Sequence, residues 1–175
     1  ALRGLEVGVD GLNQKTTDRQ TIEKELGEPG PERIWYVGDA LENGFTLEEV
    51  HALTRIDPWF LAQIKEIVDT ELAVETRTLA ELSRDELRRM KRMGFSDRQL
   101  SLLDGVPEAQ VRATRHRLGL RPVYKTVDTC AGEFPSKTPY LYSCYDEENE
   151  SGPVGDRTVV ILGSGPNRIG QGIEF

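Results

Sequence analysis

A succession of helix-start signals in the first 121 residues limits most strongly what this chain can fold into. In each signal a Ser, Thr or Asp side chain can accept a hydrogen bond from a free backbone N–H group at the start of a helix. The signals are Thr17 or Asp18, Thr46 with Glu49, Asp57 before Pro58, Thr78 with Glu81, Ser83 with Glu86, and Ser96 with Gln99. Gly94, Gly105 and Gly119 stand where left-handed helix ends belong. Together they predict about seven short helices over residues 16–121, packed as an all-α bundle.

The apolar spacing in three of these segments predicts which side chains face the core. The longest helix is expected over 57–74 and forms the spine of the bundle, because apolar residues recur along it at helical spacing. The predicted inward residues are Ile34, Val37 and Leu41 in a helix that starts near Glu32, Leu47, Val50 and Leu53 after Thr46, and Phe60, Ile64, Ile67, Val68 and Leu72 in the spine.

The character of the sequence changes after Pro122. Residues 123–129 (VYKTVDT) and 139–145 (PYLYSCY) are aromatic and β-branched, which predicts extended segments. Whether the two segments pair as a hairpin or lie extended across neighbouring domains is left open. Residues 146–157 are acidic, contain Gly and Pro and have no apolar period, so they read as a linker.

The last stretch, residues 158–175, is an apolar run followed by the glycine-rich turn GSGPNRIGQG. This pattern is typical of the first strand and loop of a parallel α/β domain, yet the sequence stops where the following helix would begin. We therefore expect the chain to end inside a domain that it does not contain, and residues 159–175 to be disordered or to pair with another chain. Gly163 and Gly165 fit a dinucleotide fingerprint, but Arg168 occupies its third glycine position and Pro166 lacks an N–H group. No Gly-Lys-Ser/Thr sequence follows, so a phosphate-binding P-loop is not predicted either.

Charge is unevenly distributed along the chain. Residues 1–76 carry a net −9, residues 77–121 a net +5 and residues 122–175 a net −4. Within the basic segment, residues 95–118 have the pattern of a helix-turn-helix, whose second helix carries Arg112, Arg115, His116 and Arg117. One interpretation is a DNA-binding regulator in which these side chains contact the duplex. The other is two helices of a bundle with a solvated polar face, which the acidic remainder of the chain favours.

No self-sufficient catalytic, cofactor or metal site is visible in the sequence. The two histidines, His51 and His116, lie on different predicted helices without metal-ligand spacing. Cys130 and Cys144 form no CxxC motif and are interpreted as free buried thiols of a reducing cytoplasm, with a disulfide as the alternative. No apolar run approaches the roughly 20 residues that a membrane-spanning helix needs. We expect a cytoplasmic, soluble chain without membrane contact.

Six strings of residues appear in an order that indicates a family: 33–41 (RIWYVGDAL), 54–64 (TRIDPWFLAQI), 89–103 (RMKRMGFSDRQLSLL), 123–134 (VYKTVDTCAGEF), 140–148 (YLYSCYDEE) and 163–175 (GSGPNRIGQGIEF). Together they resemble the middle of the large subunit of carbamoyl phosphate synthetase. The resemblance covers essentially the whole chain. It implies a mainly α fold: a small helical oligomerisation bundle with a short extended C-terminal region and a truncated first strand of an α/β domain.

The resemblance also implies a boundary map and a role. Residues 1–13 resemble the end of the carboxyphosphate-forming half, 14–150 the oligomerisation domain, and 151–175 the start of the carbamoyl phosphate-forming half. Gly170, Gln171 and Gly172 match a loop beside the family's internal carbamate passage. Intact family members are ligases that use two ATP, Mg or Mn, bicarbonate and ammonia from glutamine, with a small amidotransferase subunit, for arginine and pyrimidine synthesis. The nucleotide sites lie in the two halves, so this fragment is expected to be inactive and to hold no cofactor. Its helices are expected to make homo-oligomer contacts rather than to bind nucleic acid, while the helical face that makes the contact and the oligomeric state of the fragment alone are left open.

Overall fold

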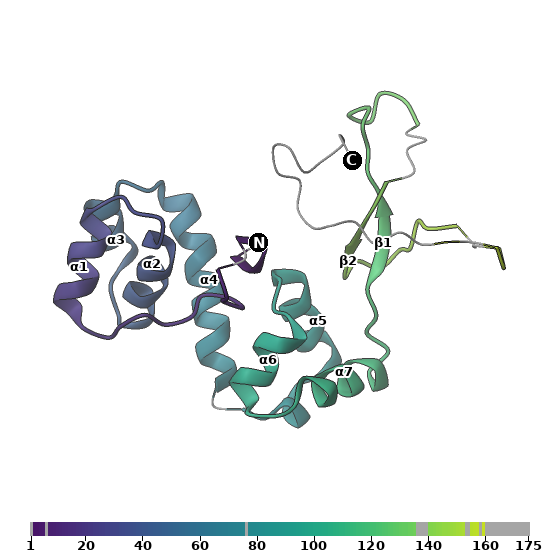
Figure 1. The fold of residues 1–175 in the computed structure, drawn as a ribbon, viewed down its shortest axis with the longest axis horizontal. Coiled ribbons are helices and arrows are strands. Elements are labelled where there is room, and N and C mark those ends of the chain that lie inside the picture. The colour runs from purple at the N-terminus through teal and green to yellow at the C-terminus, as the bar shows by residue number, and fades with distance from the viewer. Residues whose placement is uncertain are drawn as a thin grey trace.

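The computed structural model describes residues 2–5, 7–75, 77–135, 140–152, 155–157 and 159. Over these residues the chain is mainly α-helical, as predicted, and carries one two-stranded sheet (Figure 1). The α-helices are α1 (Arg19–Gly27), α2 (Arg33–Glu42), α3 (Leu47–Thr54), α4 (Pro58–Glu75), α5 (Arg84–Met93), α6 (Asp97–Asp104) and α7 (Glu108–Arg117). Two 3-10 turns cover Leu2–Leu5 and Leu79–Glu81, and the strands are β1 (Val123–Thr126) and β2 (Leu141–Cys144).

Most of the predicted helix starts are confirmed by their hydrogen bonds. The exception is Thr78 with Glu81, which begins only the 3-10 turn Leu79–Glu81, where the Thr78 N–H group donates to the Glu81 carboxylate. Thr46 and Ser83 each accept from the backbone N–H three residues ahead, while Glu49 and Glu86 reach back to complete capping boxes. Ser96 accepts from the Gln99 N–H group, but the Gln99 amide does not reach back and donates instead to Glu71. The left-handed helix ends predicted at glycines are confirmed as well. Gly94, for example, has a φ of 101°, a conformation that residues with a Cβ atom rarely adopt.

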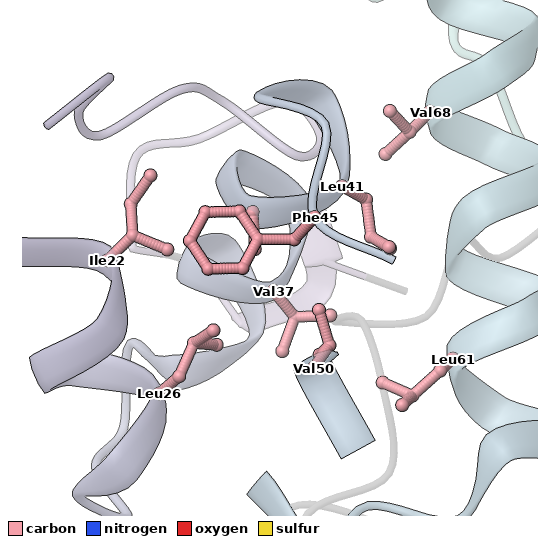
Figure 2. Close-up of a cluster of buried hydrophobic side chains, with 9 residues drawn as sticks. Ile22, Leu26, Val37, Leu41, Phe45, Val50, Leu61 and Val68 are labelled. Carbon is pink, nitrogen blue, oxygen red and sulfur yellow. The ribbon is translucent and has the colours of Figure 1, made fainter. Parts of the chain in front are cut away.

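Helix α4 is the spine of the fold and runs between the group α1–α3 and the group α5–α7 (Figure 1). Each group packs a separate hydrophobic cluster against α4. The N-terminal cluster lies between α1–α3 and the first part of α4, as Figure 2 shows for its labelled side chains. Its buried members are Ile22, Leu26, Val37, Ala40, Leu41, Phe45, Val50, Leu61 and Val68. The C-terminal cluster joins the end of α4 to α5–α7, with Val74, Leu79, Leu82, Leu87, Met90, Phe95, Leu100, Val111 and Leu120 buried. The removal of these apolar side chains from water in both clusters is the main stabilising term of the bundle.

The predicted inward face of the helices is wrong at four positions. Ile34, Leu53, Phe60 and Leu72 are exposed, while Leu61, Val68 and Val74 are the buried residues of α4. One apolar stripe cannot serve two clusters on different sides of the helix, so burial moves around α4 along its length. In the part of the chain that the structure describes, no element covers Trp59 and Phe60 on the first turn of α4, and both stay in solvent.

Strands β1 and β2 pair antiparallel, with Val123 opposite Cys144 and Thr126 opposite Leu141. The hairpin alternative is therefore the observed one. The hairpin extends away from the helices in Figure 1, although the segment after β2 returns to α5. Residues 146–150, read as part of a linker, are anchored: the N–H groups of Tyr124 and Thr126 donate to the side chains of Asn149 and Glu150. The predicted terminal strand and glycine loop, including Gly170, Gln171 and Gly172, lie outside the described residues except for Val159, so their predicted disorder or pairing stays a prediction.

Candidate functional site

The basic segment contains a buried ionic cluster, formed by Lys91 of α5, Asp97 of α6 and Arg115 of α7. Asp97 Oδ1 lies 2.9 Å from Lys91 Nζ, and Asp97 Oδ2 lies 2.9 Å from Arg115 Nη2. The three side chains are only 6–9% exposed. The two cations also donate to the backbone carbonyls of Phe95 and Leu120, so the cluster joins three helices and the loops between them.

Electrostatics in the cluster favour the ionised form of Asp97. Burial alone raises the pKa of this carboxyl, but hydrogen bonds from Arg115 and Lys91 outweigh burial and hold the pKa below its ordinary value of 3.8. The ring of Tyr145 lies 5.3 Å from Lys91 Nζ and 5.7 Å from the Arg115 guanidinium carbon, within the range of a cation–π contact. Tyr145 thereby connects the segment after β2 to the helical bundle.

Most other basic side chains of this segment also face acidic partners. Two of them, Arg88 and Arg92, pair with Glu147 and Asp146 of the segment after β2. The remaining pairs are Arg77–Glu86, Arg84–Asp85, Arg89–Glu66, Arg98–Asp10 and Arg112–Glu108, and Arg112 Nε also lies 3.8 Å from Asp97 Oδ2 at the edge of the ionic cluster. The net positive charge of 77–121 is therefore balanced in space by acidic residues, several from the segments before and after it.

This arrangement gives the helix-turn-helix interpretation no support. Of the four predicted contact residues, Arg115 is buried in the ionic cluster and Arg112 is paired with Glu108 within α7. His116 and Arg117 are exposed on the last turn of α7. A DNA-recognition helix presents a row of side chains that can reach the major groove. In α7 the central arginine, Arg115, is instead buried in its ion pair with Asp97 of α6.

The other predicted candidates are not brought together. The Nδ1 atom of His51 lies 2.7 Å from the Ile56 carbonyl oxygen, and His116 lies on a different helix. Cys130 and Cys144 are free and partly buried. Among the described residues, no group of three or more His, Cys, Asp or Glu side chains is arranged to hold a metal ion.

A second surface feature, missed by the sequence reasoning, lies on α4. Trp59 and Phe60 are 63% and 57% exposed, with ring centroids 5.0 Å apart in an edge-to-face arrangement. Further along α4, from Ala62 on, the helix also lines an open groove of about 560 Å³ together with α5 and Leu47 of α3. The signal was present in the sequence, because Trp59 falls out of phase with the buried positions Leu61 and Val68.

The fold and these features define a class: a small helical domain with an internal ionic cluster and an exposed aromatic pair. A comparison with protein families matches residues 1–119 to the family described as "Carbamoyl-phosphate synthetase large chain, oligomerisation domain". The chain belongs to this family.

Curated relatives named "Carbamoyl phosphate synthase large chain" agree with this assignment. The proteins of Haemophilus ducreyi and Pasteurella multocida are 57% and 58% identical to the chain over 175 residues, and that of Ralstonia nicotianae is 56% identical over 178 residues. Each alignment covers 100% of this chain and 16% of the relative. The chain thus spans about one sixth of the length of these relatives.

Among the described residues, no helix is both long enough and apolar enough to cross a membrane.

Proposed function

We propose that this chain is the subunit-assembly and linker region of a carbamoyl phosphate synthetase large subunit. The observation that carries the proposal is the family match over residues 1–119, which spans the seven α-helices that the structure describes. The exposed aromatic surface on α4 is in accord with a role in assembly, because clustered exposed aromatic side chains are characteristic of protein interfaces.

The proposal includes the boundary map drawn from the sequence. Residues 1–13 would end the carboxyphosphate-forming half, 14–150 would form the oligomerisation domain, and 151–175 would begin the carbamoyl phosphate-forming half. Gly170, Gln171 and Gly172 would then lie beside the carbamate passage of the intact enzyme, where the absence of a side chain at Gly172 would leave room in the lumen.

The chemistry of the intact enzyme belongs to the parts of the protein outside this chain. By family resemblance it is a cytoplasmic ligase that makes carbamoyl phosphate from bicarbonate, ammonia and two ATP, with Mg or Mn, for arginine and pyrimidine synthesis. A small glutamine amidotransferase subunit and the two synthetase halves are the expected partners. The purified chain alone is expected to be inactive, to bind neither metal nor nucleotide, and to associate with itself.

Sedimentation velocity over a hundredfold concentration range tests the assembly role. We expect the weight-average sedimentation coefficient to rise with concentration, as for a reversible oligomer. A chain that sediments as a monomer throughout would contradict the proposal. ATP hydrolysis or carbamoyl phosphate formation above the blank would contradict the expectation that the chain alone is inactive.

Fluorescence anisotropy with a labelled DNA duplex separates this role from the helix-turn-helix alternative. A DNA-binding domain would bind with an affinity that falls steeply with salt. We expect no binding at low salt, because Arg115 is enclosed in the ionic cluster and Arg112 is paired.

A further inference from the structure

The two outer edges of the β1–β2 hairpin differ in their hydrogen bonding. The edge of β1 is occupied by the segment that follows β2. There the N–H groups of Tyr124 and Thr126 donate to the side chains of Asn149 and Glu150, at 2.9 and 2.7 Å. The Glu150 N–H group in turn donates to the Tyr124 carbonyl oxygen at 2.8 Å. The outward backbone N–H groups of β1 are therefore bonded within the chain.

The edge of β2 has no comparable cover. Inside the hairpin, the Val127 N–H group donates to the Tyr140 carbonyl oxygen. Bonded and non-bonded pairs alternate along an antiparallel ladder, so in this register Leu141 and Ser143 point their N–H and C=O groups away from β1. Within the part of the chain that the structure describes, no hydrogen bond reaches these backbone groups. They are called the β2 edge below.

The sequence of β2 does not block the addition of another strand. Edge strands that remain in solvent are commonly protected by charged residues, proline or a bulge. Residues 141–144 (LYSC) contain neither charge nor proline, and their register with β1 runs without a bulge. Successive side chains of a strand point to opposite faces, and those of Leu141 and Tyr142 are 47% and 52% exposed. Both faces of the hairpin are therefore open at β2.

The hairpin also lacks a supporting layer. An isolated two-stranded hairpin is only marginally stable in water, and this hairpin extends away from the helices (Figure 1). Its firm connections to the bundle lie after β2, where Tyr145 contacts the ionic cluster and Glu147 pairs with Arg88. A third strand on the β2 edge would bond its outward groups and cover its apolar side chains.

We propose that, in the intact large subunit, an extended segment of the carbamoyl phosphate-forming half adds to the β2 edge as a third strand. The chain spans 16% of the length of its relatives, so most of the large subunit lies outside it. The boundary map places the start of that half at residue 151, directly after the segment that lines β1. Consecutive elements are usually adjacent in space, and covalent linkage raises their effective concentration. This inference rests on the proposed function and gives the hairpin a specific part in the linker role.

The proposed strand has a mechanical consequence. Residues 145–150 tie the hairpin both to α5 and to the edge of β1. A strand bonded to the β2 edge would therefore fix the second half relative to the helical bundle. Strand addition of this kind obtains its affinity from main-chain hydrogen bonds and its selectivity from alternate side chains.

Hydrogen exchange at single amides, read by mass spectrometry with electron-transfer fragmentation, tests the proposal. The 175-residue chain is compared with the intact large subunit. The Tyr142 and Cys144 amides face β1 and serve as internal references, because their ladder bonds are present in both proteins. We expect the Leu141 and Ser143 amides to exchange faster than these references in the 175-residue chain. In the intact subunit they should exchange at least about fivefold more slowly, the order expected from one hydrogen bond of ordinary net strength.

Ser143→Pro removes one outward N–H group and leaves the ladder with β1 in place, since proline is tolerated at such edge positions. Ser143→Ala keeps the N–H group and is the matched control. In the intact subunit, Ser143→Pro should return the Leu141 amide to the fast exchange of the 175-residue chain, whereas Ser143→Ala should not. Unchanged exchange at Tyr142 in the 175-residue Ser143→Pro chain would show that its hairpin is intact.

Photo-crosslinking identifies the strand. With p-benzoylphenylalanine in place of Tyr142, we expect cross-links within the same polypeptide, to residues beyond 175. Cross-links to the first half, to the small subunit or to a second copy would overturn the assignment to the second half.

The exchange results decide whether a strand is present. Slower exchange at Leu141 and Ser143 in the intact subunit, lost at Leu141 in Ser143→Pro and kept in Ser143→Ala, supports it. Equal exchange in the intact subunit and in the 175-residue chain overturns it. Sedimentation of the 175-residue chain decides the assembly role separately, so either proposal can fail while the other stands.

Discussion

Replacing Asp97 with asparagine would remove the carboxylate at the centre of the buried ionic cluster. Lys91 and Arg115 would then lie side by side, each almost fully buried, with their carbonyl contacts but without the Asp97 counter-charge. The asparagine amide keeps the shape of the side chain and one acceptor oxygen, so the change isolates the loss of charge from the loss of packing. Asp97 also begins α6, where a negative charge stabilises the helix N-terminus.

The expected cost follows from leaving buried cations uncompensated. Removal of one partner from a buried ion pair typically costs about 3–5 kcal/mol, and the helix-terminus effect adds about 0.3–1 kcal/mol. A domain of this size is stable by about 5–15 kcal/mol in total. The Asp97→Asn variant should therefore lose a large part of its free energy of unfolding, and the loss should be centred on α5–α7.

Urea unfolding followed by circular dichroism measures this free energy. Asp69→Asn is the matched control, because Asp69 forms an exposed pair with Lys65 at 2.7 Å, with side chains 40–55% exposed. Exposed pairs of this type contribute about 0.3–0.5 kcal/mol. Equal losses of unfolding free energy in Asp97→Asn and Asp69→Asn would refute the argument that burial makes the Asp97 ion pairs more stabilising than an exposed pair.

Three further predictions concern the same structure. The folded pKa of Asp97 lies below its ordinary value of 3.8, so the stability that the Asp97 carboxylate contributes is present above that pH and is lost as the pH falls through the folded pKa. In urea titrations, the difference in free energy of unfolding between wild type and Asp97→Asn should therefore become smaller below about pH 4. A difference that stays constant with pH would contradict the lowered pKa of Asp97. Tyr145→Ala removes the ring above both cations and should cost about 1 kcal/mol, with faster amide exchange over 141–150 and unchanged exchange in α1–α3 by mass spectrometry. Thr46→Ala breaks the capping box of α3 and should cost about 1 kcal/mol in thermal unfolding, whereas Thr46→Ser, which keeps the hydroxyl, should cost much less.

The order of the helices could be predicted from the sequence because their boundaries depend on neighbours three or four residues away. Ser83 and Glu86 satisfy each other's backbone groups in any helix that starts there, and Gly94 permits the left-handed end that follows. The family was also accessible from the sequence, since strings such as 123–134 are specific in themselves. These properties require no knowledge of which helix packs on which.

Tertiary structure alone decided which of these local features matter for interaction. Arg115 looks like a DNA-contacting residue in a linear sequence, but it is buried in an ion pair with Asp97, 18 residues earlier, which also binds Lys91. Phe60 continues an apolar period, yet it is exposed because Leu61, about 100° further round the first turn of α4, is the residue that faces the N-terminal cluster. The sequence by itself determined where helices begin and end, because capping is local. The structure decided which charges are buried and which aromatic side chains remain free, because burial depends on residues that are distant in the chain.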